Sequence, residues 1–135
     1  MDALPLIGVD HVGIAAAAGD TALTGLLGDG ALAGQAMPSG VTVARFGPGG
    51  GLELVWPGRP GTPVDGFLER RGPGLHHVAL RTDADLEELA QTLRAGGVVF
   101  AGPGVERSSD GRPCLFLHPR STGGVLVELV QGPRP

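Results

Sequence analysis

Hydrophobic residues in the first half of the chain fall into short runs separated by glycine and proline. The runs with the length and residue types of strands are 6–16, 31–37, 41–46 and 51–57. A short helix is predicted over 20–27, where Gly25 costs about 1 kcal/mol relative to alanine. The first half, about 6–57, therefore predicts a β-α-β-β-β module.

The second half repeats this order after a connector rich in proline and glycine at about 58–73, which has one predicted helical turn at 65–70. Its strand-like runs are 75–81, 98–101, 114–118 and 125–131. The clearest helix of the chain lies between the first two of these runs. A second β-α-β-β-β module is therefore predicted over about 74–131.

This clearest helix is the segment "DADLEELAQTLRAGG", residues 83–97. Its apolar stripe consists of Leu86, Leu89 and Leu93. Either Asp83 or Asp85 can cap its start, and the two glycines end it.

The two modules also share short stretches of sequence. "GVDHVGI" at 8–14 returns as "GLHHVAL" at 74–80, and "LELV" at 52–55 returns as "VELV" at 127–130. Repeats of one supersecondary unit usually pack about a pseudo-twofold axis. The prediction is one α+β domain over 1–135, in which two βαβββ modules related by a pseudo-twofold form a curved mixed sheet around a cleft.

Aligning the modules by this repeat places His11 on His77 and Glu53 on Glu128. Two neutral imidazoles and two carboxylates suit an octahedral divalent ion with two positions left for water or substrate. Nitrogen and oxygen donors without thiolate favour cobalt, manganese, nickel, iron or zinc. The sequence therefore predicts a metal-binding cleft that performs catalysis.

A purely structural reading of these residues is the alternative. Taken singly, each histidine is better explained as a satisfied core residue and each glutamate as part of a solvated strand face. The repeated set favours the metal, because buried carboxylates without a partner are costly.

Three further residues carry less weight. His76 is predicted on the sheet face opposite His77, with Asp10 as its counterpart and a structural or supporting role. His118 either reaches the mouth of the cleft or caps the turn at Pro119. Cys114 is predicted to be a small core residue rather than a nucleophile.

Composition narrows the partners and the compartment. The net charge is −4 with no lysine, which argues against nucleic acid as a partner. The single cysteine rules out an internal disulfide and fits a reducing compartment, and the first residues lack the pattern of an export signal. A soluble, cytoplasmic protein without membrane association is expected.

Three segments resemble the vicinal oxygen chelate superfamily (glyoxalase, bleomycin resistance and dioxygenase proteins) and, within it, the methylmalonyl-CoA epimerase family. They are "VDHVGIA" at 9–15, "FLERRGPGLHHVAL" at 67–80 and "FLHPRSTGGVLVELVQ" at 116–131. The resemblance implies a divalent metal, with Co²⁺ first and Mn²⁺, Ni²⁺ or Zn²⁺ as alternatives. It implies as ligands the same set, His11, Glu53, His77 and Glu128.

The resemblance also implies a reaction, in which the R and S forms of methylmalonyl-CoA interconvert at C2 through an enolate. Glu128 and Glu53 are the implied acid and base, in an order that the sequence leaves open. A homodimer is implied as well. The CoA phosphates are assigned to the turn formed by Arg120, Ser121, Thr122, Gly123 and Gly124.

The chain departs from the family at two places. Val43 stands where some relatives have a glutamate that is a proposed base, which leaves one proton-transfer role unassigned. The first helix, "GDTALTGLLGD", lacks the aromatic residues that are usual there, so the pocket wall or dimer contact built from it is expected to differ.

Three other kinds of protein in this superfamily are alternatives. A glyoxalase I type lactoylglutathione lyase shares the ligand set. Its last turn commonly reads Asp-Pro-Asp-Gly, whereas this chain reads His-Pro-Arg-Ser-Thr-Gly-Gly at 118–124, which favours the epimerase. An extradiol dioxygenase needs only two histidines and one carboxylate as metal ligands, so Glu53 as a fourth ligand counts against this class. A metal-free small-molecule-binding protein of the bleomycin-resistance type has no need for the ligands, and 4% aromatic residues offer little to stack on a flat drug.

Overall fold

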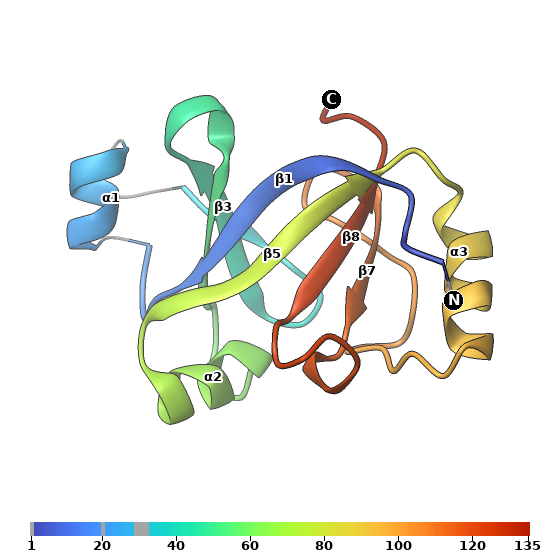
Figure 1. Cartoon of the computed structure of the whole chain (residues 1–135). Helices are drawn as coiled ribbons and strands as arrows, with labels where there is room; N and C mark the ends of the chain where they lie inside the picture. Colours follow the sequence, from blue (N-terminus) through green and yellow to red (C-terminus); the bar gives the residue numbers. More distant parts are fainter. Residues whose placement is uncertain (1, 20, 29–32) are drawn as a thin grey trace. The chain divides into compact units, whose positions relative to one another are not determined.

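The computed structural model describes residues 2–19, 21–28 and 33–135 (Figure 1). The strands among these residues form one mixed sheet in the order β2-β3-β4-β1-β5-β8-β7-β6. The strands are β1 (Leu6–Ala15), β2 (Gln35–Ala36), β3 (Val41–Phe46), β4 (Leu52–Pro57), β5 (Gly74–Thr82), β6 (Glu106–Arg107), β7 (Pro113–Leu117) and β8 (Val127–Gln131). The helices are α1 (Ala22–Leu27), α2 (Pro63–Arg71), α3 (Leu86–Ala95) and two short 3₁₀ helices, η1 (Pro48–Gly50) and η2 (Pro119–Ser121).

The order β-α-β-β-β occurs twice, from β1 to β4 and from β5 to β8, with α2 between the two runs. This confirms the predicted fold class. The chain divides into two compact units, one of residues 11–76 and one of residues 1–10 and 77–135. Both β1 and β5 begin in one unit and end in the other.

In the unit of residues 11–76, β4 pairs in parallel with β1 and antiparallel with β3. Side chains that alternate along these strands form two apolar clusters. The first includes Ala15, Val41, Val43 and Val55 together with Val64 of α2. The second includes Ala16, Phe46 and Leu54, with Leu23 of α1 packed against it.

In the unit of residues 1–10 and 77–135, β8 pairs in parallel with β5 and antiparallel with β7. Its main core joins α3 to β7 and β8 through Leu86, Ala90, Leu93, Leu115, Leu117 and Leu129. A smaller cluster of Ala79, Cys114 and Val130 lies across β5, β7 and β8.

Helix α3 begins and ends for local reasons. The carboxylate of Asp85 accepts a hydrogen bond from the Glu88 N–H at 3.1 Å, so Asp85 rather than Asp83 is the cap. The side-chain oxygen of Gln131 accepts a second N–H, that of Leu86, at 2.9 Å, which ties the end of β8 to the start of α3. Gly97, with φ of 86°, allows the left-handed turn after the helix.

Two predicted elements need correction. Segment 98–101 is not a strand but contributes one bridge, from Phe100 to Leu117. The short strand β6 lies instead at Glu106–Arg107, between the predicted strands 98–101 and 114–118. The connector holds a full helix, α2, because Thr62 and Asp65 form a capping box and Pro63 occupies its first turn.

The first helix begins at Ala22, with Thr21 as its cap. Its predicted start at residue 20, and the start of the predicted strand at 31–32, lie outside the described residues. No helix in the described part of the chain is long and apolar enough to cross a membrane.

Candidate metal centre

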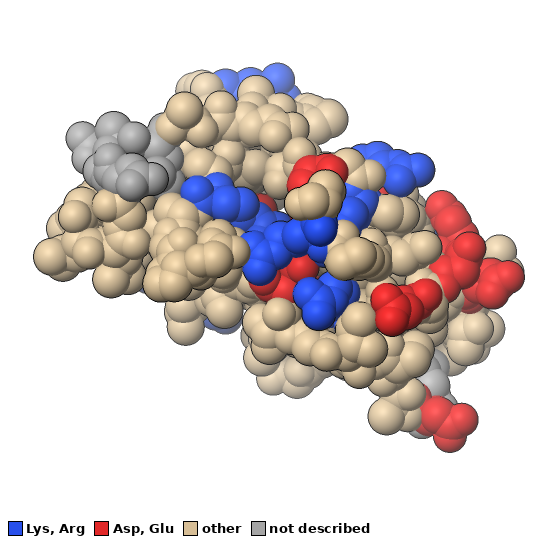
Figure 2. Space-filling model, turned by 90° about the horizontal axis from the view of Figure 1, so that it is seen from above, with Lys and Arg blue, Asp and Glu red and all other residues tan. Residues whose placement is uncertain are grey.

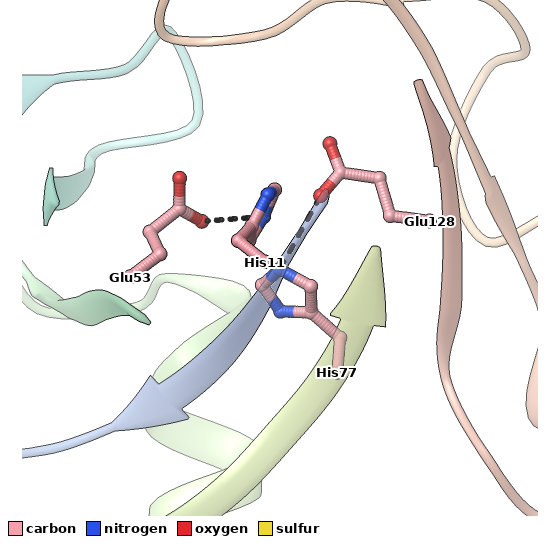
Figure 3. Close-up of side chains that lie close together, drawn as sticks. All are labelled: His11, Glu53, His77 and Glu128. Carbon is pink, nitrogen blue, oxygen red and sulfur yellow. Dashed lines mark ion pairs between the residues drawn. The ribbon is translucent and has the colours of Figure 1, made fainter. Parts of the chain in front are cut away.

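His11 and Glu53 form the first of two buried pairs. Glu53 on β4 lies opposite Gly13 in the parallel pairing with β1, so His11, two residues before Gly13, points to the same side of the sheet. The distance from His11 Nε2 to Glu53 Oε1 is 3.6 Å (Figure 3). Only 2% of His11 and 7% of Glu53 are exposed.

His77 and Glu128 form the second pair, and its construction is the same. Glu128 on β8 lies opposite Ala79 in the parallel pairing with β5, and His77 is again two residues earlier on the paired strand. The distance from His77 Nε2 to Glu128 Oε1 is 3.3 Å (Figure 3). Both residues are buried. The repeat seen in the sequence is therefore also a repeat in strand register.

The spacing within each pair suits two donors to a common ion. Neighbouring donors about 2.1 Å from one octahedral ion lie about 3 Å apart, close to the 3.3 and 3.6 Å measured here. Each of the four residues offers one ligand atom of a type that holds a divalent metal ion. A buried carboxylate is stable only with a compensating charge or several donors. Each pair thus offers one imidazole nitrogen and one carboxylate oxygen to a divalent metal ion.

Arg45 also belongs to this site, although the sequence reasoning did not single it out. It lies opposite Glu53 in the antiparallel β3–β4 pair, and its Nε is 3.3 Å from Glu53 Oε2. Its Nη1 donates to the Gly50 carbonyl at 3.3 Å. The sequence did contain a signal for Arg45. It lies two residues after Val43, the position compared with the family's glutamate, and side chains two apart on a strand lie on the same face of the sheet.

The corresponding neighbour in the second module is apolar. Phe116 on β7 lies opposite Glu128 on β8. The Phe116 ring meets the His77 imidazole edge-on, with 5.6 Å between the ring centroids. The two pairs are therefore alike in ligands and different in surroundings.

The predicted CoA turn, Arg120 to Gly124, is a compact link between β7 and β8. The N–H groups of Ser121, Thr122 and Gly124 donate to carbonyls of His118 and Pro119 within the turn. The Ser121 hydroxyl accepts from the Val99 N–H at 2.9 Å, and the Thr122 hydroxyl donates to the Val125 carbonyl. These groups shape the turn, while the exposed side chain of Arg120 extends from it. Binding of CoA here stays a prediction.

A second charged network adjoins the ligand His11. Arg112, 6% exposed, donates to both carboxylate oxygens of Asp10 at 2.8 and 2.9 Å and to those of Asp110 at 3.0 Å. It also donates to the Gly132 carbonyl at 2.9 Å, just after β8. Basic and acidic side chains lie beside one another on the face drawn in Figure 2 as well.

The network shifts the pKa of two of its members. Burial opposes the charge of Asp110, but hydrogen bonds from Arg112 and Ser108 outweigh it and lower the pKa of Asp110 to about 2. Burial likewise opposes the charge of Arg112, and the two carboxylates outweigh it and raise the pKa of Arg112 above its ordinary value. Asp10, the counterpart of His76 in the first module, thus belongs to a buried ion-pair network.

The remaining predicted residues have structural surroundings. His118 caps η2, because its Nδ1 accepts from the Arg120 N–H at 3.0 Å. Cys114 is buried in the core cluster with Ala79 and Val130. His76 packs edge-on against Phe67 of α2, with 4.9 Å between centroids.

Residues 10–116 match the family model of the Glyoxalase/Bleomycin resistance protein/Dioxygenase superfamily, and the chain belongs to this superfamily. Three of the four candidate ligands fall within the matched range, and Glu128 follows it.

Among more particular relatives, the chain is similar to methylmalonyl-CoA epimerases. The mitochondrial methylmalonyl-CoA epimerase of Dictyostelium discoideum is 38% identical over 79 residues, which are 58% of this chain and 47% of that protein. The chain thus spans about half the length of this curated relative.

Two solved structures agree over more of the fold. The methylmalonyl-CoA epimerase of Mycobacterium tuberculosis superposes with a TM-score of 0.75 at 28% identity, covering 98% of this chain and 93% of that one. A variant of the Streptomyces coelicolor methylmalonyl-CoA epimerase, in complex with 2-nitronate-propionyl-CoA, superposes with a TM-score of 0.76 at 29% identity, covering 94% and 98%. The predicted resemblance to this group is confirmed.

Proposed function

We propose that the chain catalyses the interconversion of the two C2 epimers of methylmalonyl-CoA. The observation that carries the proposal is the pair of buried His–Glu sets built with the same strand register. The names of the similar proteins, and the acyl-CoA analogue bound to one of them, support the substrate class.

The donor set fits a divalent metal ion held by His11, Glu53, His77 and Glu128. When bound, such an ion polarises the thioester oxygen of the substrate and stabilises the negative charge that develops as the C2 proton leaves. Nitrogen and oxygen donors without sulfur suit cobalt, manganese, nickel or zinc, and cobalt is the first candidate because the sequence resembles the methylmalonyl-CoA epimerase family.

Proton transfer at C2 is assigned to the carboxylates of Glu128 and Glu53. Epimerisation requires that one group removes the proton from one face and that another returns it to the opposite face. Val43 is buried opposite Val55 and cannot take part, so the roles fall on the two ligand glutamates. Their burial keeps water away from the enolate.

The proposal also covers CoA binding, the compartment and the oligomeric state. Arg120 and the turn to Gly124 hold the CoA phosphates, with the guanidinium as the principal anion donor because several turn N–H groups bond internally. The protein acts in the cytoplasm as a homodimer.

Deuterium exchange tests the reaction directly. The cobalt-loaded protein, incubated with (2R)-methylmalonyl-CoA in heavy water, is expected to replace the C2 hydrogen by deuterium and to form the 2S epimer, as followed by mass spectrometry and chiral chromatography. A chelator-treated sample and a protein-free sample are the controls. Absence of exchange together with turnover of a glutathione hemithioacetal would assign the chain to the lyases instead.

Metal binding is tested by thermal unfolding without any substrate. At a free cobalt concentration 100 times the dissociation constant, the free energy of unfolding is expected to rise by about 2.7 kcal/mol over the metal-free protein. His77→Ala should abolish this gain, whereas His118→Ala, which removes a histidine outside the ligand group, should keep it. An equal gain in both variants would contradict the site.

A further inference from the structure

The surroundings of the two glutamates differ in a way that the repeat alone does not explain. The cross-strand neighbour of Glu53 is Arg45, and that of Glu128 is Phe116. A guanidinium thus adjoins one carboxylate, and a benzene ring occupies the matching strand position beside the other. This difference concerns how the Glu53 carboxylate is held.

The two oxygens of Glu53 face different partners. Oε1 lies 3.6 Å from His11 Nε2, on the side of the paired ligand. Oε2 lies 3.3 Å from Arg45 Nε, on the side of β3. His11, Glu53 and Arg45 therefore form a row across the neighbouring strands β1, β4 and β3.

Arg45 is itself held in place. Its Nη1 donates to the carbonyl of Gly50, in the turn that joins β3 to β4, and 22% of its side chain is exposed. The guanidinium is planar and presents its donors in fixed directions. The guanidinium thus keeps Glu53 Oε2 turned towards Arg45.

We propose that Arg45 is a positioning residue that limits Glu53 to ligation through one oxygen. This inference rests on the proposed metal site. A carboxylate free to bind through both oxygens would occupy a second coordination position, one of those that the substrate needs. By holding Oε2, Arg45 keeps that position open.

The proposal predicts an unusual combination of effects for Arg45→Met. Cobalt affinity should stay equal or rise, because a cation is removed and the second oxygen becomes available. The visible absorption spectrum of bound cobalt should change, since its intensity and position report coordination number. The kcat/KM for epimerisation should fall about tenfold to a hundredfold.

Three comparisons isolate the role of Arg45. Arg59→Met is the matched control, because Arg59 is exposed and donates only to the Ser39 carbonyl at 3.4 Å among its described contacts; it should leave spectrum and kinetics unchanged. Arg45→Lys should recover part of the wild-type spectrum. In a Glu53→Gln background the ligand has one oxygen, so adding Arg45→Met should change the spectrum no further.

These measurements distinguish a positioning role of Arg45 from direct substrate binding and from a purely structural role. An unchanged cobalt spectrum with a raised KM would mean that Arg45 binds the substrate directly, and would overturn the proposal. A changed melting temperature with unchanged spectrum and kinetics would overturn it in favour of a structural role. Since the spectrum needs no substrate, it tests Arg45 even if the epimerase activity is absent; failure of the wild-type protein to bind cobalt would overturn both.

Discussion

Replacing Glu128 by glutamine is expected to lower kcat for epimerisation by about 10²- to 10⁴-fold. The amide keeps the size of the side chain and an oxygen for the metal, but it cannot accept or deliver the C2 proton. Glu128 is buried beside His77, where no bulk water can replace it as the proton carrier. Steady-state kinetics, together with the rate of deuterium incorporation at C2, measures the loss.

The effect of this substitution on stability is expected to be much smaller than its effect on turnover. Glu128→Gln should lower kcat far more than it lowers the melting temperature, because glutamine is nearly isosteric and removes a buried charge. Glu53→Gln should lower turnover as well, with the same excess of the kinetic effect over the effect on stability. Glu106→Gln, on the exposed strand β6, is the control and should leave both quantities unchanged. Full turnover in Glu128→Gln with metal bound would remove Glu128 from proton transfer.

The grouping of the four candidate ligands into two His–Glu pairs could be predicted from the sequence because two independent regularities agree. Side chains alternate along a strand, so the residue type at each position indicates its face. The internal repeat then assigned each histidine a glutamate, and the structure reproduces that assignment as a shared register in the parallel pairs. Long, regular elements such as α3 were also predictable, since their stripe and caps are local signals.

What the sequence did not predict depends on contacts between distant segments. Arg112 reaches Asp10 across 102 positions, and nothing near either residue indicates the other. Strand β6 is only two residues long and is defined by its pairing with β7, not by a pattern of its own. The sequence alone does not place Arg45 beside Glu53, because only the register of β3 with β4 determines which residue adjoins Glu53.

Arg112→Met is expected to lower the free energy of unfolding at pH 7 by about 3–5 kcal/mol, measured by urea denaturation. The arginine joins three separate parts of its unit: Asp10 of β1, Asp110 in the loop before β7, and the Gly132 carbonyl after β8. Removing the cation leaves Asp10, which is 2% exposed, as a buried negative charge. Because Asp10 directly precedes His11, the variant should also bind cobalt more weakly.

A matched control separates this effect from the loss of any arginine. Arg107→Met alters strand β6, which precedes the same loop, but Arg107 is exposed and donates to the Gly111 carbonyl at 3.2 Å, so a change within about 0.5 kcal/mol is expected. The double substitution Asp10→Asn with Arg112→Gln removes both charges and keeps polar groups of similar size. It should therefore cost less than Arg112→Met alone.

The pH dependence of the Arg112→Met effect gives a further check on its cause. The pKa of Asp110 is lowered from 3.8 to about 2 in the folded protein, where hydrogen bonds from Arg112 and Ser108 outweigh burial. A lowered folded-state pKa means that Asp110 contributes stability above pH 3.8, and that this contribution is lost as the pH falls towards 2. The difference in unfolding free energy between the wild-type protein and Arg112→Met should thus be constant from pH 7 to about 5 and shrink on further acidification. A difference that stays the same down to pH 2 would mean that the arginine stabilises the fold through packing of its side chain and not through its charge.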